Sequence, residues 1–142
     1  MSGSAVADVD GSSNAIQFDL ENTGWSAATI DAIKINSTNT SADIVAETNS
    51  GNDETSKEVY VDADTDGDYE AGDSGGSKLF IGNQETLSNA STINAGNQGT
   101  VYVYEFQENS GTLVNVEDSR VTVTIFYGDG SKDTFTLDVP SP

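Results

Sequence analysis

Short runs of β-branched and aromatic residues, separated by clusters of Gly, Asn, Asp and Ser, limit most strongly how this chain can fold. Runs such as Thr29–Asn36 and Arg120–Tyr127 partly alternate apolar and polar side chains, as strands with one buried face do. No stretch keeps the period of about 3.6 residues that an amphipathic helix requires. The length of 142 residues suits one domain. We therefore predict a single all-β domain over residues 15–140.

Turn signals between these runs indicate the architecture. Asn22-Thr23-Gly24 and Asn94-Ala95-Gly96-Asn97 are typical of turns, and Gly128-Asp129-Gly130-Ser131 between two alternating runs is typical of a hairpin. About seven to nine short strands with frequent turns favour an immunoglobulin-like antiparallel β-sandwich. The other expected strands are Ala15–Glu21, Ile44–Ala46, Glu58–Val61, Lys78–Ile81, Ala90–Ile93, Thr100–Phe106 and Thr134–Val139.

The run Thr29–Asn36 contains one irregularity. Its apolar phase slips between Ile30 and Ile33, so a strictly alternating strand would place one of these side chains in solvent. Such a slip indicates a β-bulge near Asp31-Ala32, where one extra residue bends the strand and increases its twist.

The first residues are outside this pattern. Residues 1–14 are expected to be a flexible lead-in, or to add an edge strand at Ala5–Asp10. The start, Met1-Ser2-Gly3-Ser4, resembles a cloning remnant, and neither a signal peptide nor a transmembrane run is visible. We expect that a targeting segment or membrane anchor has been removed ahead of it.

The charge balance predicts the solvent in which the domain works. The chain has 24 acidic and 5 basic residues, with a formal net charge of −19, and the acids occur in every segment. A compact domain with this charge repels itself in dilute buffer, whereas at about 1 M salt the Debye length is only about 3 Å. We predict a surface adapted to molar salt, as in a halophilic archaeon. Bound calcium that neutralises the acids is an alternative, and both can hold.

Composition also restricts partners and chemistry. Nucleic acid and anionic membrane are poor partners for an acidic surface. The chain has no Cys and no His, which excludes thiol nucleophiles, zinc-thiolate sites and histidine bases. A carboxylate pair could serve a glycosidase, but nothing in the sequence singles out such a pair. We therefore predict that the protein is not an enzyme.

The segment Asp62–Asp73 matches the spacing of the twelve-residue calcium loop. That loop takes oxygen ligands at positions one, three and five, glycine at six, a backbone carbonyl at seven and a carboxylate at twelve. Position nine, which often acts through water, is also acidic here. The predicted Ca²⁺ ligands are Asp62, Asp64, Asp66, the carbonyl of Asp68, Glu70 and Asp73, with Gly67 at the sixth position.

The flanks of the loop differ from those of a helix–loop–helix site. Val59-Tyr60-Val61 before the loop indicates a strand, and Gly75-Gly76 after it indicates a further loop. We therefore predict an isolated calcium loop between strands. Aspartate replaces the usual glutamate at the last position, Asp73, and its shorter side chain weakens bidentate binding. The alternative is that these acids belong only to the salt-adapted surface, but their spacing around Gly67 favours calcium.

Aromatic residues offer candidate contact surfaces. Trp25, the one Trp of the chain, follows a turn, and it either stacks on a sugar or partner or is partly buried against the sandwich edge. Partial burial is the more frequent outcome for Trp. Tyr102, Tyr104 and Phe106 share one face of the expected strand Thr100–Phe106. They form either a binding stripe or the core face of that strand.

Three N-x-S/T acceptor patterns of secreted glycoproteins are present. In a chain rich in Asn, Ser and Thr some of these matches arise by chance, so they add limited support for an extracellular address. The candidate glycosylation sites are Asn36, Asn39 and Asn89.

Three segments resemble haloarchaeal secreted domains. Ile16–Gly24, IQFDLENTG, resembles their opening strand and NTG turn. Ile93-Asn94-Ala95-Gly96, running on to Val101–Phe106, is similar to their later strand pair, and Val121–Ser131 resembles their closing hairpin. Such domains often follow a type IV pilin-like helix and resemble the outer domains of archaeal pilins and archaellins. This chain shows no prepilin processing site and no assembly helix, so a filament role depends on a segment that it lacks.

We expect a non-catalytic extracellular structural domain of a haloarchaeal surface or pilin-like filament protein, stabilised by calcium and high salt. Other copies of itself, or cell-envelope protein or glycan, are the expected partners in assembly or adhesion. Membrane contact would come only through a segment absent from this chain. The alternative is a carbohydrate- or surface-layer-binding module, such as an archaellum envelope anchor, which an exposed groove lined by Trp25 or Tyr102 would favour. A small secreted hydrolase ranks third and requires two close carboxylates in a cleft.

Overall fold

A computed structural model describes residues 5–9, 14–46, 59–63, 71–72, 78–103 and 105–140, with backbone alone for 5–9, 71–72, 78 and 88–90. The strands follow one another along the chain, and the described part contains no helix. Their bounds are β1 Ala5–Val9, β2 Ile16–Glu21, β3 Ala28–Thr38, β4 Ile44–Ala46, β5 Val59–Asp62, β6 Ala71–Gly72, β7 Lys78–Phe80, β8 Gln84–Ile93, β9 Gln98–Val103, β10 Phe106–Gln107, β11 Arg120–Tyr127 and β12 Lys132–Asp138.

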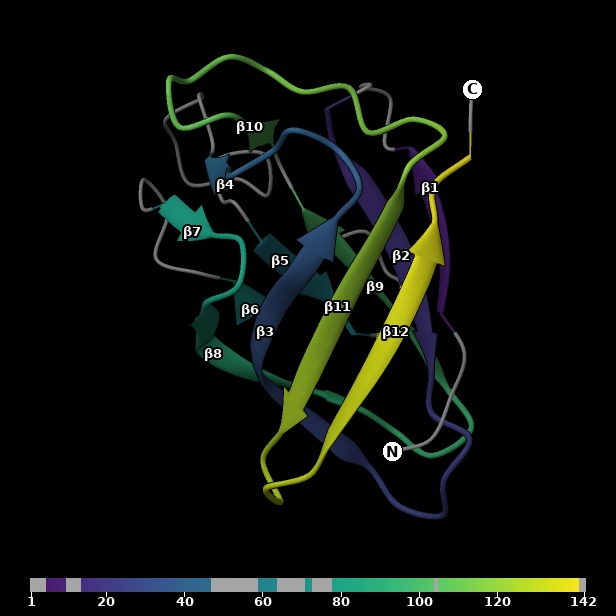
Figure 1. Cartoon of the computed structure of the whole chain (residues 1–142). Helices are drawn as coiled ribbons and strands as arrows, with labels where there is room; N and C mark the ends of the chain where they lie inside the picture. Colours follow the sequence, from purple (N-terminus) through teal and green to yellow (C-terminus); the bar gives the residue numbers. More distant parts are fainter. Residues whose placement is uncertain are drawn as a thin grey trace.

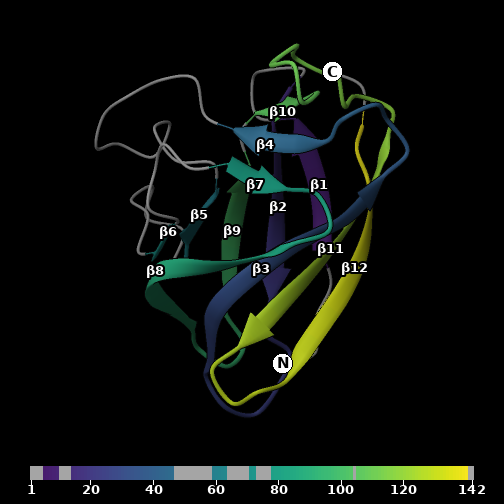
Figure 2. The same cartoon turned by 60° about the vertical axis from the view of Figure 1, so that its left-hand side comes forward.

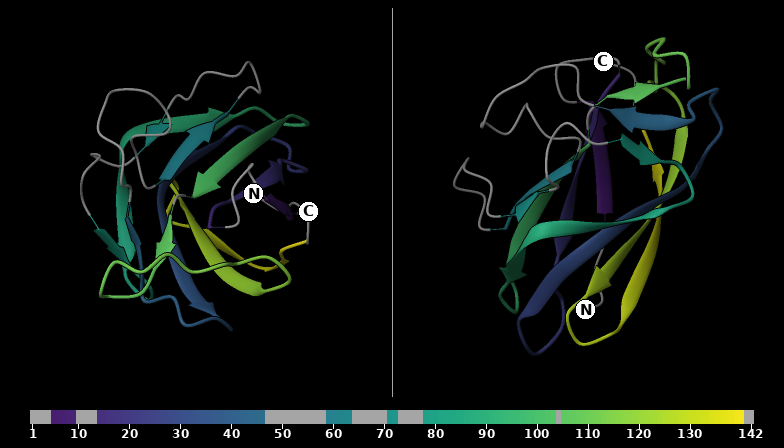
Figure 3. Two further views of the ribbon diagram at one scale, coloured as in Figure 1. Left: turned by 90° about the horizontal axis from the view of Figure 1, so that it is seen from above. Right: turned by 90° about the vertical axis from the view of Figure 1, so that its left-hand side faces the viewer.

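Two large antiparallel sheets face each other and a small one covers one end (Figures 1 and 2). The first has the order β1-β2-β9-β5-β6, the second β12-β11-β3-β8, and the covering sheet β10-β4-β7. At the edges, β1 contacts β12 and β6 contacts β8, so the strands form a nearly closed outline from above (Figure 3). The prediction of an all-β antiparallel sandwich is confirmed. The described strands exceed the expected seven to nine because β6 and β10 are added and because Ala5–Val9 forms β1, the edge strand offered as the alternative to a flexible lead-in.

The core lies between the two large sheets. Ile16, Phe18 and Leu20 of β2 are buried on one face, as their alternation predicts. They belong to one cluster with Val123 and Ile125 of the opposite sheet. Full burial of each such side chain contributes about 1.5–3 kcal/mol, which is the main gain that holds the sheets together.

The bulge predicted in β3 is present at Asp31. In the pairing of β3 with β11, Ile30 lies opposite Tyr127 and Ala32 opposite Phe126, so Asp31 is the extra residue. The pairing of β3 with β8 shifts between the same positions. The bulge lets Ile30 and Ile33 both reach the core, where each is at most 1% exposed.

The expected strand Thr100–Phe106 is wrong as one element. β9 ends at Val103 in a large sheet, and β10 begins at Phe106 in the covering sheet. Val103 and Phe106 are both fully buried, and a regular strand would turn residues three apart to opposite faces. The chain resolves this conflict by changing sheets between them.

Gly99 of β9 provides space where β5 ends. A Cβ at this position would lie 3.1 Å from the carbonyl oxygen of Asp62, 3.2 Å from Cα of Ala63 and 2.9 Å from Cδ1 of Ile93. Two of these three neighbours are backbone atoms, which cannot rotate away. The close approach of β5 to β9 at the start of the acidic loop therefore requires glycine.

We predict that Gly99→Ala lowers the unfolding midpoint in molar salt by roughly 5–10 °C, because overpacking of this kind costs about 1–3 kcal/mol. Thermal unfolding followed by circular dichroism measures it. Gly128→Ala is the matched control, since a Cβ there meets nothing closer than 3.5 Å. An unchanged midpoint for Gly99→Ala would show that β5 can move without cost.

Candidate functional site

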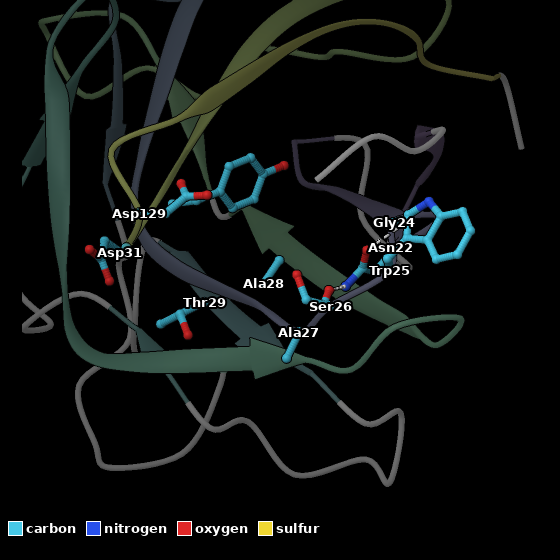
Figure 4. Close-up of a pocket in the computed structure, with 11 residues that line it drawn as sticks. Asn22, Gly24, Trp25, Ser26, Ala27, Ala28, Thr29, Asp31 and Asp129 are labelled. Atoms are coloured by element: carbon cyan, nitrogen blue, oxygen red, sulfur yellow. Dashed lines mark hydrogen bonds between the residues drawn. The ribbon is translucent and has the colours of Figure 1, made fainter.

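A groove of about 500 Å³ lies at the end of the sandwich that holds the β11–β12 hairpin, and Figure 4 draws the residues that line it. Figure 1 shows that this end is opposite the covering sheet. The connection between β2 and β3 forms one side, and the bulge of β3 with the β11–β12 hairpin forms the other. This volume is within the range of about 300–1,000 Å³ that small-ligand sites occupy. We call it the Trp25 groove; its lining residues are Asn22, Gly24, Trp25, Ser26, Ala27, Ala28, Thr29, Asp31, Tyr127, Gly128 and Asp129.

Asn22 fixes the loop that carries Trp25. Its side chain is fully buried, and its Nδ2 donates to the carbonyls of Ser26 and Ile93, both at 2.9 Å. Its Oδ1 accepts from the backbone N–H of Gly24 at 3.0 Å. Because these bonds lie on both sides of Trp25 in the sequence, the backbone of the loop is held in one conformation.

Trp25 itself is fully exposed, with a relative exposure of 102%. The expectation of partial burial against the sandwich edge is therefore wrong. The buried side chain of this loop is Asn22, which bonds the carbonyls of Ser26 and Ile93, and the indole is left in solvent. An apolar side chain of this size in water is unusual for Trp and identifies a surface that a ligand or partner can cover.

The opposite side of the groove carries two carboxylates, Asp31 and Asp129 (Figure 4). Asp31 is the bulge residue of β3, and its carboxylate lies beside Gly128. The hairpin is joined to β3 at this point, since the N–H of Gly128 donates to the carbonyl of Thr29 at 2.9 Å. Bulges often redirect a side chain toward a functional site, and here one directs Asp31 to the groove.

Asp129 is held by the turn that contains it. The N–H and the hydroxyl of Ser131 both donate to Oδ1 of Asp129. These two hydrogen bonds lower the pKa of Asp129, which is exposed to solvent. The carboxylate is therefore ionised at neutral pH and accepts hydrogen bonds. It is unsuited to donate a proton as a general acid.

Tyr127 forms the buried wall behind these acids. It is 4% exposed, and its hydroxyl donates to Oδ2 of Asp133 at 2.9 Å. Burial, and then the hydrogen bond to Asp133, raise the pKa of Tyr127 far above its ordinary value of 10.0. The neutral phenol is thereby fixed as a donor, and the β11–β12 hairpin is anchored at the groove.

Tyr102, a second aromatic candidate, does not line the groove. Tyr102 is half-buried and stacks on Tyr60, with ring centroids 4.3 Å apart and an interplanar angle of 9°. The core side of β9 is formed by Val101 and Val103, so Tyr102 faces outward. Tyr104 lies outside the described residues. Trp25 and Tyr102 therefore do not form one contact surface.

The acidic loop is closed by strand pairing. Val61 of β5 lies opposite Ala71 of β6, so residues 62–70 connect a hairpin. Ala71 and Gly72 form β6 although the sequence places them in the loop, because main-chain pairing with β5 needs no patterned side chains. Asp62 is in β5 opposite Thr100, and it is 4% exposed.

The remaining predicted calcium ligands, which are Asp64, Asp66, Asp68, Glu70 and Asp73, lie outside the described residues. Within the part of the chain that the structure describes, no group of three or more acidic, Cys or His side chains is placed to hold a metal ion. Calcium binding by Asp62 and these acids thus stays a prediction.

The three candidate glycosylation sites differ in environment. Asn39 is exposed just after β3, and its Oδ1 accepts from the N–H of Arg120 at 2.9 Å. Asn36 is half-buried at a second irregularity of β3, and its Oδ1 accepts from the hydroxyl of Thr124 at 3.0 Å. Asn89 is in β8, where only the backbone is described. Asn39 therefore has the more accessible amide of the two described side chains.

No family model matches the chain, and no curated protein matches it. One solved structure with some similarity is the collagen-binding subdomain of the Enterococcus faecalis surface protein ACE. It is 14% identical, the match covers 98% of this chain and 96% of that chain, and the TM-score is 0.27. A TM-score this low carries no conclusion about the present chain.

The described residues contain no helix of the length and apolarity needed to cross a membrane.

The groove offers a ligand an aromatic platform, two acceptor carboxylates and the hydroxyls of Ser26 and Thr29. Sequence patterns indicated Trp25 and the bulge at Asp31, but gave no signal for Asp129. Its role follows from the approach of the hairpin to β3, more than ninety residues apart in the chain.

We predict that stability falls as pH rises above about 10, the ordinary pKa of tyrosine, by up to about 1.4 kcal/mol per pH unit from Tyr127. The folded state keeps Tyr127 protonated while the unfolded chain loses the proton, so this stability is present below pH 10 and lost above it. Denaturant unfolding between pH 8 and 11 measures the slope. Tyr127→Phe should flatten it, and an equal slope in the variant would contradict the assignment.

Proposed function

We propose that this protein is a non-catalytic extracellular binding domain that attaches to cell-envelope material through the Trp25 groove. The observation that carries the proposal is the fully exposed Trp25 at the rim of a groove, on a loop that Asn22 anchors. An exposed Trp on a loop with a fixed backbone provides a large contact area, and binding has to order only its side-chain torsions. This feature favours a binding module over a purely structural filament domain.

The charge of the chain supports a high-salt environment for this domain. The net charge of −19 suits molar salt. Arg120 pairs with Asp138 at 3.0 Å, and both side chains are largely exposed. With 24 acidic and 5 basic residues, the chain has too few basic side chains to neutralise its acids. Exposed ion pairs contribute only about 0–1 kcal/mol to stability. Screening by salt therefore reduces the repulsion among the acids more than ion pairing does. We assign the domain to the surface of a halophilic archaeon.

A hydrolase would use the same two carboxylates, Asp31 and Asp129, differently. One acid of a glycosidase pair must keep its proton near neutral pH. The pKa of Asp129 is lowered by Ser131, and this carboxylate is exposed to solvent. The arrangement suits acceptance of hydrogen bonds from a ligand better than acid catalysis.

We predict that the purified domain cosediments with isolated haloarchaeal cell envelopes in molar salt, and that Trp25→Ala reduces the bound fraction at least about tenfold, as loss of a Trp hot spot does. Phe80→Ala is the matched control, because Phe80 is an exposed aromatic in β7, at the other end of the molecule (Figure 2). Equal retention of wild type and Trp25→Ala would refute the function proposed for the groove.

Calcium has a structural part in this proposal. Asp62 is a buried carboxylate at the end of β5, and the hairpin register brings the ends of the acidic segment 62–70 together. A cation held by Asp62, Asp64 and Asp66 with the later acids would offset the repulsion among them. The spacing in the sequence and the closure of the loop both support this assignment.

We predict that calcium at about a hundred times its Kd adds about 2.7 kcal/mol in molar salt, raising the midpoint by roughly 5–10 °C over chelator-treated protein. Differential scanning calorimetry measures the shift. Asp64→Asn with Asp66→Asn should abolish it, whereas Glu21→Gln with Glu117→Gln, which remove the same charge elsewhere, should not. A shift that survives the first pair would exclude this loop as the site.

A further inference from the structure

We infer that the Trp25 groove binds a neutral glycan, with one pyranose ring stacked on the indole of Trp25 and hydroxyl groups of a following unit donating to Asp31 and Asp129. The inference rests on the binding function proposed above and adds the chemical class of the ligand. The glycan can belong to an envelope glycoprotein or to a free polysaccharide, since both present the same chemistry.

The shape of the groove suits an extended ligand. Trp25 lies on one side, Asp31 and Asp129 lie on the other, and Ser26 and Ala28 lie between them (Figure 4). The volume of about 500 Å³ is in the usual range for small ligands. A ligand that contacts both sides must carry an apolar face at one end and hydrogen-bond donors at the other. A disaccharide or trisaccharide has both.

Hydrogen bonding in the groove also favours hydroxyl donors. Ser131 donates twice to one oxygen of Asp129, and an ionised carboxylate accepts about four hydrogen bonds in all. Asp31 and Asp129 thus offer acceptors, and no Lys or Arg is among the described residues that line the groove. Anionic ligands are therefore disfavoured, whereas neutral sugar hydroxyls can donate without bringing a charge.

A cationic side chain of a partner protein is the competing ligand. A cation interacts with an indole within about 6 Å of the ring centroid, so a compact ammonium at Trp25 leaves the carboxylates on the far side unused. The charge of −19 is also spread over the whole chain and does not mark out this end for a cation. In molar salt charge attraction is screened, whereas stacking and hydrogen bonding persist.

The test is isothermal titration calorimetry in molar NaCl with neutral disaccharides and trisaccharides of glucose, mannose, galactose and N-acetylglucosamine. Trilysine and triarginine serve as cationic probes. We expect binding of at least one sugar. Trp25→Ala should weaken it at least about tenfold, and Asp129→Ala several-fold, while Phe80→Ala leaves it unchanged.

Envelopes treated with periodate, which cleaves vicinal diols of sugars, separate the two levels of the proposal. Loss of Trp25-dependent cosedimentation after periodate supports a glycan even if every sugar of the panel fails. Trp25-dependent retention that survives periodate, together with binding of trilysine or triarginine alone, overturns the glycan and keeps the binding function. Retention that never depends on Trp25 overturns both.

Discussion

The buried amide of Asn22 is the interaction on which the groove end of this molecule depends. Its side chain bonds the carbonyl of Ile93, where β8 ends, and its backbone bonds the turn at Gly96 and Asn97. The two large sheets are thus joined at this end by one polar residue. A buried carbonyl left without its donor costs about 1–3 kcal/mol, so the amide contributes to stability as well as to the position of Trp25.

Much of the fold could be predicted from local patterns, and the groove could not. The alternation in β2, the hairpin at Gly128–Ser131 and the bulge at Asp31 each leave a signal within a few residues of sequence. The break between Val103 and Phe106 leaves none, because both residues look like parts of one alternating run. The break arises because β9 pairs with β2 and β5 in a large sheet, whereas β10 pairs with β4 in the covering sheet.

The positions of the groove residues also depend on contacts between residues far apart in the sequence. Trp25 was recognisable as a candidate, but the more frequent fate of Trp is burial, and what prevents it is a contact between Asn22 and Ile93, 71 positions apart. The meeting of Asp31 with Gly128 and Asp129 likewise depends on the pairing of β3 with β11. Long-range pairing of strands determines these positions, and a single sequence carries no local trace of it.

The meeting of β1 with β12, and of β6 with β8, has a consequence for how the domain behaves at high concentration. Open sheet edges are templates for strand addition by neighbouring copies, which leads to aggregation. Here the edges of the two large sheets face one another, so added strands find little room. Salt that screens the acidic surface then brings copies close without joining their backbones, and crowding stays reversible.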